Sequence, residues 1–182
     1  SGLQLEALIL AGGLGTRLSS VVPNLPKPMA PIAGKPFLEI LLESLYKKGF
    51  DSIILSVGHL SEKIISHFGG QYKGMTITYV VEKYPLGTGG AIREALKMAS
   101  QEHIYIFNGD TFVDFDITGS ERLWNEVHSP IIIGSKVEDA GRYGRLLLDG
   151  ERVIGFSEKG LIGPGIINAG CYVMPASLAS QL

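Results

Sequence analysis

The sequence predicts an α/β fold, with a Rossmann-like, mostly parallel and doubly wound sheet that carries helices on both faces. Short apolar runs alternate with segments of helical periodicity up to about residue 110, an order typical of parallel strands joined by helices. The first apolar run, residues 7–10, lacks polar alternation, as expected for a strand that is buried on both faces. A length of 182 residues is sufficient for one domain with a sizeable core.

Alternating strands and helices are expected in this first part of the chain. The expected strands cover residues 7–10, 52–57, 75–81 and 104–107. The first helix opens at Pro36, because a proline at the first helical position lacks only an N–H that has no helical partner, and it ends at Gly49. The next two helices begin at Ser61 and Ala91.

The pattern changes in the last third of the chain, where strands follow one another directly. Residues 131–137, 144–148 and 152–157 are predicted strands. Asp149-Gly150 predicts a hairpin turn between the last two of them, and another apolar run covers residues 169–174.

Composition limits the partners to be expected. The formal net charge is −2 and 19% of the residues are charged, so nothing points to a nucleic-acid or anionic-membrane surface. No apolar stretch approaches the ~20 residues that span a bilayer, and the first apolar run is too short for a signal peptide. The single cysteine, Cys171, lies in an apolar run and is expected to be a buried core residue. We expect a cytoplasmic protein, and a homo-oligomer is left open.

The glycine-rich stretch after the first strand is a candidate phosphate-binding loop. Residues 11–17 read Ala-Gly-Gly-Leu-Gly-Thr-Arg. Without Cβ atoms the backbone of such a loop can be approached closely, and its N–H groups can converge on an anion. Arg17 adds a planar, charged fork that suits phosphate oxygens. Lys27 lies between Pro26 and Pro28, which restrict the backbone on either side of this second cation.

Two well-known glycine motifs do not describe this loop. The G-x-x-x-x-G-K-[ST] pattern of a Walker loop is absent from the sequence. The G-x-G-x-x-G dinucleotide fingerprint starts at Gly13 and Gly15 but fails at its third glycine, where Leu18 stands. An ordinary strand-to-helix turn is the alternative for a bare glycine cluster, and Arg17 and Lys27 count against it.

Asp110 is the leading candidate for a metal ligand. It follows a predicted buried strand through Asn108 and Gly109, at the sheet edge where ligands of such folds bind. A carboxylate there can hold Mg²⁺ against phosphate oxygens, and from spacing alone a helix-capping aspartate is an equal alternative. Asp114 and Asp116 are interpreted as a solvated strand end. The histidines show no metal spacing and are interpreted as surface or helix-end residues: His59, His67, His103 and His128.

These motifs together resemble a known family. AGGLGTRL at residues 11–18, followed by PKPM at residues 26–29, resembles the signature of the sugar-1-phosphate nucleotidyltransferases. The longer run PKPMAPIAGKPFLE, with RYGR at residues 142–145 and GIINAG at residues 165–170, is similar to one branch, the D-glycero-α-D-manno-heptose 1-phosphate guanylyltransferases.

The resemblance implies an enzyme that joins a nucleoside triphosphate to a sugar 1-phosphate and releases pyrophosphate, with Mg²⁺ as cofactor. GTP and D-glycero-α-D-manno-heptose 1-phosphate are the favoured substrates, and the product would serve the assembly of surface polysaccharide such as capsule. Glu82 supports GTP, because a carboxylate can accept hydrogen bonds from both N1–H and the N2 amino group of guanine. A solvated loop charge is the alternative for Glu82.

The resemblance also assigns roles to residues within a single domain, 1–182. The nucleotide-binding half covers about residues 3–115 and the sugar-phosphate half about residues 116–182. The implied catalytic residues are Arg17, Lys27 and Asp110, of which Asp110 is the metal ligand. The implied nucleotide-binding residues are Leu10, Ala11, Gly12, Gly13, Gly15, Thr16, Glu82, Gly87, Thr88 and Asn108. The implied sugar-phosphate-binding residues are Gly144, Glu158, Lys159 and Asn168.

Other functions stay open at this point. Within the family they are mannose-1-phosphate guanylyltransferases and the uridylyl- and thymidylyltransferases. A nucleotide-binding regulatory module without turnover belongs to another class. A nicotinamide-dependent oxidoreductase is disfavoured, because Val57-Gly58-His59 provides no acid after the second strand.

One departure from the family concerns the metal site. The family normally supplies a second metal-binding aspartate from a segment near its C-terminus, and no such segment follows Ser177. We therefore expect a truncated version of a longer enzyme.

Overall fold

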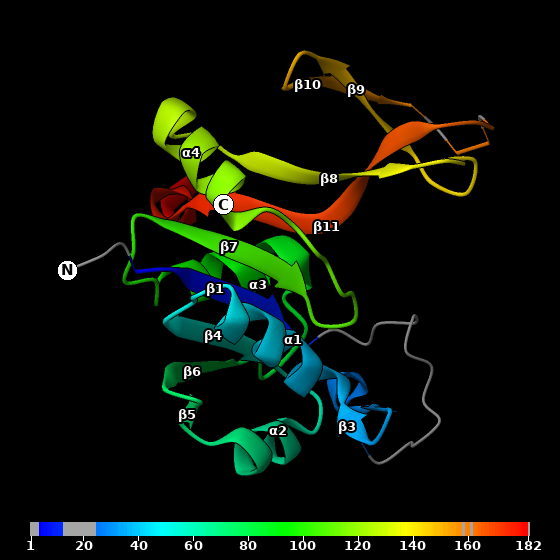
Figure 1. The fold of residues 1–182 in the computed structure, drawn as a ribbon. Coiled ribbons are helices and arrows are strands. Elements are labelled where there is room, and N and C mark those ends of the chain that lie inside the picture. Colours follow the sequence, from blue (N-terminus) through cyan, green and yellow to red (C-terminus); the bar gives the residue numbers. More distant parts are fainter. Residues whose placement is uncertain (1–3, 13–24, 158, 161, 182) are drawn as a thin grey trace.

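A mixed β-sheet with helices on both faces organises the protein (Figure 1). The computed structural model describes residues 4–12, 25–157, 159–160 and 162–181, which form one nine-stranded sheet and a separate two-stranded ladder. The strands are β1 (Glu6–Leu10), β2 (Pro31–Ile32), β3 (Lys35–Pro36), β4 (Ser52–Val57), β5 (Gln71–Tyr72), β6 (Met75–Val81), β7 (His103–Asn108), β8 (Ile131–Val137), β9 (Arg145–Asp149), β10 (Arg152–Ser157) and β11 (Gly165–Pro175). The helices are α1 (Phe37–Lys47), α2 (Ser61–Phe68), α3 (Gly87–Leu96) and α4 (Ile117–Val127), with the 3₁₀ helices η1 (Lys27–Met29) and η2 (Ala176–Gln181).

The strands in the middle of the sheet are parallel and lie in the order β7-β1-β4-β6. Antiparallel strands extend the sheet on both flanks: β5 pairs with β6, and β11 pairs with β7 and also with β8 and β9. The predicted Rossmann-like α/β fold with a parallel centre is therefore confirmed. The boundary between a nucleotide-binding and a sugar-phosphate half stays a prediction, because the sheet continues across it.

The direction in which the sheet grows reverses at β1. The chain first adds β4 and β6 on one side of β1, and α3 then carries it back to β7 on the other side. The connections that follow β1 and β7 leave the same edge of the sheet and diverge there. Such a point opens a crevice beyond the carboxyl ends of the strands, which is where ligands bind in open α/β sheets.

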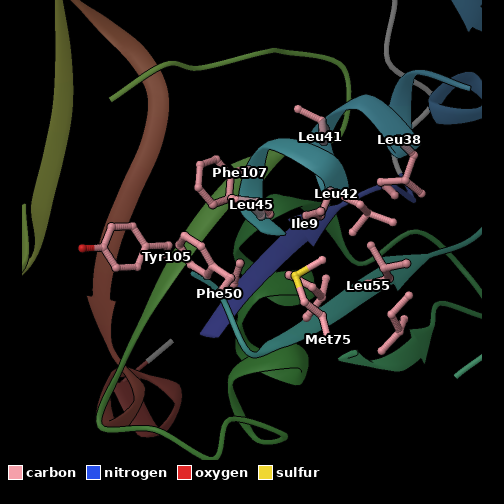
Figure 2. Packing of buried hydrophobic residues seen from close by; sticks show 14 of the residues in the cluster. Ile9, Leu38, Leu41, Leu42, Leu45, Phe50, Leu55, Met75, Tyr105 and Phe107 are labelled. Carbon is pink, nitrogen blue, oxygen red and sulfur yellow. The ribbon is translucent and has the colours of Figure 1, made fainter. Parts of the chain in front are cut away.

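Both faces of β1 are buried under helices. Neighbouring residues of a strand point to opposite faces, so Ile9 lies in one cluster with Leu55 and the helix α1, and Leu8 lies in another with Leu96 of α3. Figure 2 shows the leucines of α1 over the sheet beside Phe50. The leucines that α1 buries are Leu38, Leu41, Leu42 and Leu45. Helical spacing of apolar residues was thus sufficient to predict α1.

Helix α4 was not predicted. Its fully buried residues are Ser120 and Trp124, and Ile117 and Leu123 pack against the core while partly exposed, so this mostly polar segment was not recognised as a helix. The interpretation of Asp114 and Asp116 as a strand end is wrong, because Asp116 directly precedes α4 and no strand includes either residue.

The prediction of His103 as a surface or helix-end residue is also wrong. It begins β7 and is buried, and its Nε2 lies 2.7 Å from Oε2 of Glu121 on α4. Its ring stacks on Trp124 with 4.7 Å between centroids. The polar partner and the stacking partner both belong to the unpredicted helix, which explains why sequence reasoning left this histidine at the surface.

Two other expectations concern the core and the membrane. Cys171 is buried as predicted, and burial raises the pKa of its thiol above the ordinary value. None of the helices in the described ranges has the length and apolar character that crossing a bilayer requires.

Glu6 is a buried carboxylate at the amino end of the parallel strands. One of its oxygens accepts hydrogen bonds from the backbone N–H groups of Ser100 and Gln101 at 2.8 and 3.3 Å. The other accepts from the hydroxyls of Ser52 and Ser100 at 3.0 and 2.9 Å. Glu6 therefore ties the turn before β7 to β1 and β4, at the edge opposite the crevice.

Replacing Glu6 by alanine is expected to lower the free energy of unfolding by about 3 kcal/mol, because two backbone N–H groups lose their acceptor. Urea denaturation followed by circular dichroism measures this difference. The matched control is Glu102→Ala, which removes an exposed carboxylate from the same turn and is expected to change stability by less than about 0.5 kcal/mol. Equal stability of the two variants would contradict the assigned role of Glu6.

Candidate active site

Backbone segments at the ends of four strands converge at the carboxyl edge of the sheet. The N–H of Ala11 donates to Ser56 O at 2.7 Å, and the N–H of Gly109 donates to Leu10 O at 2.9 Å. The loop after β1 is therefore hydrogen-bonded on one side to β4 and on the other side to the loop after β7. The N–H of Glu82 extends the same pattern by donating to Val57 O at 2.7 Å.

Glycines are required where these loops approach each other. A Cβ atom on Gly109 would lie 2.9 Å from Leu10 O, and one on Gly12 would lie 3.1 Å from the carbonyl carbon of Val57. A Cβ atom on Gly58 would lie 3.1 Å from Gly12 O. These contacts are to backbone atoms, which cannot move aside as a flexible side chain can. The close packing of the three loops fixes the floor of the crevice.

A cleft of about 530 Å³ lies above this floor. Its size is in the range of small-molecule sites in proteins, ≈ 300–1,000 Å³. It is lined by Leu10, Ala11, Gly12, Lys27, Pro28, Ser56, Gly58, His59, Glu82, Lys83, Tyr84, Pro85, Gly87, Thr88, Ala91, Asn108, Gly109 and Asp110. The structure thus brings together the described members of the predicted catalytic and nucleotide-binding sets.

Asp110 is partly exposed at the end of β7, directly after the glycine that packs on Leu10. Its Oδ1 accepts a hydrogen bond from the hydroxyl of Thr111 at 3.0 Å. Within the described ranges there is no cluster of three or more His, Cys, Asp or Glu side chains that would enclose a metal ion. A single carboxylate in an open cleft fits Mg²⁺, which proteins often hold through one or two carboxylates together with substrate phosphates and water.

Lys27 begins the 3₁₀ helix η1 and faces the cleft from the side of the β1 loop. Pro26 precedes it with φ −61°, and Pro28 and Met29 after it are buried. The N–H of Met29 donates to Pro26 O at 2.8 Å, which closes the turn around the lysine. The cation therefore extends from a backbone that is fixed by prolines and by burial on both sides.

Glu82 follows β6 and lies partly buried in the cleft wall. The hydroxyl of Ser56 lies 3.5 Å from its Oε1, at the upper limit for a hydrogen bond. The helix α3 begins at Gly87, which has φ +74°, and Thr88 occupies its first turn. Helix α3 starts four residues before the predicted position at Ala91. Its N-terminus lines the cleft, where unpaired N–H groups favour an anionic or polar ligand.

The three described residues of the predicted sugar-phosphate set do not line this cleft. Asn168 lies at a bulge of β11, where its Oδ1 accepts from the N–H of Gly170 at 2.8 Å and its Nδ2 donates to the hydroxyl of Tyr172 at 2.7 Å. A Cβ atom on Gly170 would lie 3.4 Å from Nδ2 of Asn108, so the bulge packs beside the cleft.

The other two residues lie near the β9–β10 hairpin. Gly144 precedes β9, and a Cβ atom there would lie 2.9 Å from Ser157 O, so a side chain would push the two strands apart. Lys159 follows β10 and is exposed. The remaining predicted site residues lie outside the described residues: Gly13, Gly15, Thr16, Arg17 and Glu158.

Sequence reasoning missed several residues of the cleft. Ser56 lies near the end of β4, and Gly58 and His59 come directly after that strand. The end of this strand was predicted from the sequence, but its residues were given no role in ligand binding. Tyr84 contributes an aromatic ring that is 69% exposed at the cleft rim. The signal available in the sequence was position alone, because every strand of the parallel centre ends at the same edge.

Comparisons with known proteins agree with this geometry. The family model described as nucleotidyl transferase matches residues 6–182. A D-glycero-alpha-D-manno-heptose 1-phosphate guanylyltransferase of Aneurinibacillus thermoaerophilus is 44% identical over 170 residues, which are 93% of this chain and 74% of that protein. A protein of the same name from Campylobacter jejuni subsp. jejuni serotype O:2 is 46% identical over 172 residues, 93% of this chain and 76% of that protein.

A solved structure is similar over nearly the whole chain. The crystal structure of HddC from Yersinia pseudotuberculosis complexed with GMP-PN superimposes with a TM-score of 0.83 at 38% identity, covering 98% of this chain and 80% of that one. The match includes the parallel centre of the sheet and the loops that form the cleft, since nearly the whole chain is covered. The glycine loop, the proline-flanked lysine and the carboxylate after β7 thus occur in a chain that belongs to the nucleotidyl transferase family.

Proposed function

We propose that the protein transfers a guanylyl group from GTP to D-glycero-α-D-manno-heptose 1-phosphate, forming a GDP-heptose and pyrophosphate. The observation that carries the proposal is the cleft at the carboxyl edge. It unites Lys27, Glu82 and Asp110 in a chain that is 44% and 46% identical to two heptose 1-phosphate guanylyltransferases. We propose the cytoplasm as the location of the reaction.

The chain's own residues would act by positioning and by stabilising charge. An oxygen of the sugar phosphate attacks the α-phosphorus of the triphosphate in line, a bond from phosphorus to the sugar phosphate forms, and pyrophosphate leaves. The attacking oxygen is already ionised at neutral pH, so no protein nucleophile is needed. Lys27 lines the cleft and is proposed to contact phosphate oxygens there, and Arg17 and the glycine-loop amides are proposed to hold the β- and γ-phosphates.

Asp110 is the residue that would hold Mg²⁺. A bound magnesium ion neutralises charge on the phosphates and orients them for displacement. Asn108 and the N-terminus of α3 line the same cleft and are proposed to contact the nucleotide. Lys159 is proposed to hold the phosphate of the acceptor sugar, from outside the nucleotide cleft.

Glu82 is proposed to read the base. Its two carboxylate oxygens are both acceptors, which matches the adjacent N1–H and N2–H donors of guanine, whereas glutamine offers one acceptor and one donor. Glu82→Gln is therefore expected to lower the preference for GTP over UTP, measured as the ratio of kcat/KM values, by about 30-fold. The matched control is Glu62→Gln on α2, an exposed carboxylate that is expected to leave the ratio unchanged. If Glu82→Gln leaves the ratio of kcat/KM values for GTP and UTP unchanged, Glu82 does not recognise the base.

The substrate pair is tested by pyrophosphate release with Mg²⁺. GTP, UTP, dTTP, ATP and CTP are each combined with D-glycero-α-D-manno-heptose 1-phosphate and with mannose 1-phosphate. We expect release with GTP and the heptose phosphate. Faster release with mannose 1-phosphate would mean that mannose 1-phosphate, not the heptose phosphate, is the sugar substrate. Faster release with another nucleotide would mean that GTP is not the nucleotide substrate. Nucleotide binding without release in any combination would favour a binding module.

A further inference from the structure

Two loops near the β9–β10 hairpin carry residues of the proposed acceptor site. One loop covers residues 139–144 and contains Gly144, and the other follows β10 and contains Lys159. Their backbones are joined directly, because the N–H of Gly160 donates to Gly141 O at 2.9 Å and the N–H of Ala140 donates to Gly163 O at 2.8 Å. The relative position of Gly144 and Lys159 therefore depends on this junction.

The carboxylate of Asp139 is at the centre of the junction. Its Oδ1 accepts from the N–H of Gly141 at 2.9 Å and from the N–H of Gly163 at 3.3 Å, so one oxygen contacts both loops. These two backbone bonds, that of Gly141 first, hold the pKa of Asp139 below its ordinary value. Nη2 of Arg145 donates to Gly163 O at 3.1 Å and adds a contact from the start of β9.

The sequence of the junction explains why a side-chain acceptor is needed there. Gly160 and Gly163 have φ +109° and +111°, values that other residues rarely adopt. Glycine is the residue that loses most conformational freedom on folding, so a loop rich in glycine is held in one conformation only where bonds outside the loop stabilise it. Asp139 supplies such a bond to Gly163 from a position two residues after β8, a strand that is anchored in the sheet by β11.

We propose that Asp139 is a positioning residue for the acceptor substrate, because its carboxylate fixes the loop of Lys159 against the loop of Gly144. The inference rests on the proposed function. Asp139 itself is an unsuitable ligand for a sugar phosphate, since a carboxylate and a phosphate repel each other. Its contribution is indirect: it sets where the ammonium group of Lys159 meets the acceptor phosphate, and a displacement of about 1 Å at such a group can cost up to ~10²-fold in rate.

The test compares Asp139→Ala with Asp139→Asn. Alanine removes both hydrogen bonds, and the KM for the sugar 1-phosphate is expected to rise about tenfold while the KM for GTP stays within about twofold. Asparagine retains an Oδ1 acceptor and loses only the charge, so it is expected to recover most of the wild-type KM. Asp149→Ala in the β9–β10 turn is the matched control, because it removes an exposed carboxylate at the other end of the hairpin.

A second readout is independent of turnover. Amide hydrogen exchange of residues 139–145 and 159–163 is expected to accelerate in Asp139→Ala, while the thermal midpoint stays near that of Asp149→Ala. A parallel rise in the KM for GTP, or a fall in the thermal midpoint that accounts for the loss, would mean a general structural role and overturn the proposal. An unchanged sugar-phosphate KM would overturn it as well.

The two proposals fail in different ways. If wild-type protein releases no pyrophosphate with any sugar phosphate, the proposed function fails, and faster exchange in Asp139→Ala would then show only that the junction exists. If the wild type turns over and Asp139→Ala keeps its acceptor KM, the function stands and the positioning role is wrong.

Discussion

Replacing Asp110 by asparagine is expected to lower kcat by about 10³-fold, the upper range for loss of one charge-stabilising group. The physical reason is the position of this carboxylate, which follows the rigid end of β7 and lines the cleft beside Asn108 and Gly109. Asparagine preserves the size of the side chain and its acceptor oxygen for Thr111, so the loop is expected to keep its conformation. The measurement is pyrophosphate release as a function of Mg²⁺ concentration.

The same titration with Asp114→Asn provides the control. Asp114 belongs to the same loop, but its side chain is 86% exposed and pairs with Lys48 at 3.2 Å. An exposed ion pair contributes ~0–1 kcal/mol, so this variant is expected to retain turnover and the wild-type requirement for Mg²⁺. Turnover of Asp110→Asn within threefold of the wild type would exclude Asp110 as the metal ligand.

Lys27→Ala is expected to lower kcat by about 10²-fold, because it removes a cation from the place where charge develops on the phosphates. The surrounding turn should persist, since its bonds and burial come from Pro26, Pro28 and Met29. Single-turnover kinetics with saturating GTP separate this loss from a loss of nucleotide binding.

Lys35→Ala is the matched control for Lys27. Lys35 is also close to a proline, in β3, but its side chain is 63% exposed and lies 4.0 Å from Glu39. Removing it is expected to leave kcat unchanged. Equal kinetics for Lys27→Ala and wild type, at equal thermal stability, would show that Lys27 is a structural member of the η1 turn.

The parallel centre of the fold could be predicted because burial on two faces leaves a plain pattern in the sequence. The runs that became β1, β4 and β7 are mostly apolar and buried, whereas β6 alternates buried and exposed residues in its first half, and α1 shows leucines at helical spacing. Helix α4 was missed, because only Trp124 of its apolar residues is fully buried and Ile117 and Leu123 are partly buried against the core. Polar contacts also hold it, such as the hydrogen bond that Tyr105 donates to Glu121 at 2.7 Å, and contacts of this kind have no periodic signature.

The residues of the candidate site could be predicted where they lie in loops directly after the parallel strands. Lys27, Glu82 and Asp110 were selected for their chemistry and for the loops that carry them, and the structure places all three along one cleft. Ser56 and His59 were missed because their residue types gave no reason to select them. The junction around Asp139 was missed for a different reason: it consists of hydrogen bonds between segments distant in the sequence, as in the 24-residue separation of Asp139 and Gly163.

The measurement that tests the account most directly follows the oxygen atoms of the acceptor phosphate. Heptose 1-phosphate labelled with a heavy oxygen isotope in its phosphate group is incubated with GTP, Mg²⁺ and the enzyme, and both products are analysed by mass spectrometry. If the sugar phosphate attacks the α-phosphorus in the cleft, all of the label is found in the GDP-heptose and none in the pyrophosphate. Label in the pyrophosphate, or a GDP-heptose without label, would contradict nucleotidyl transfer as the reaction of this site.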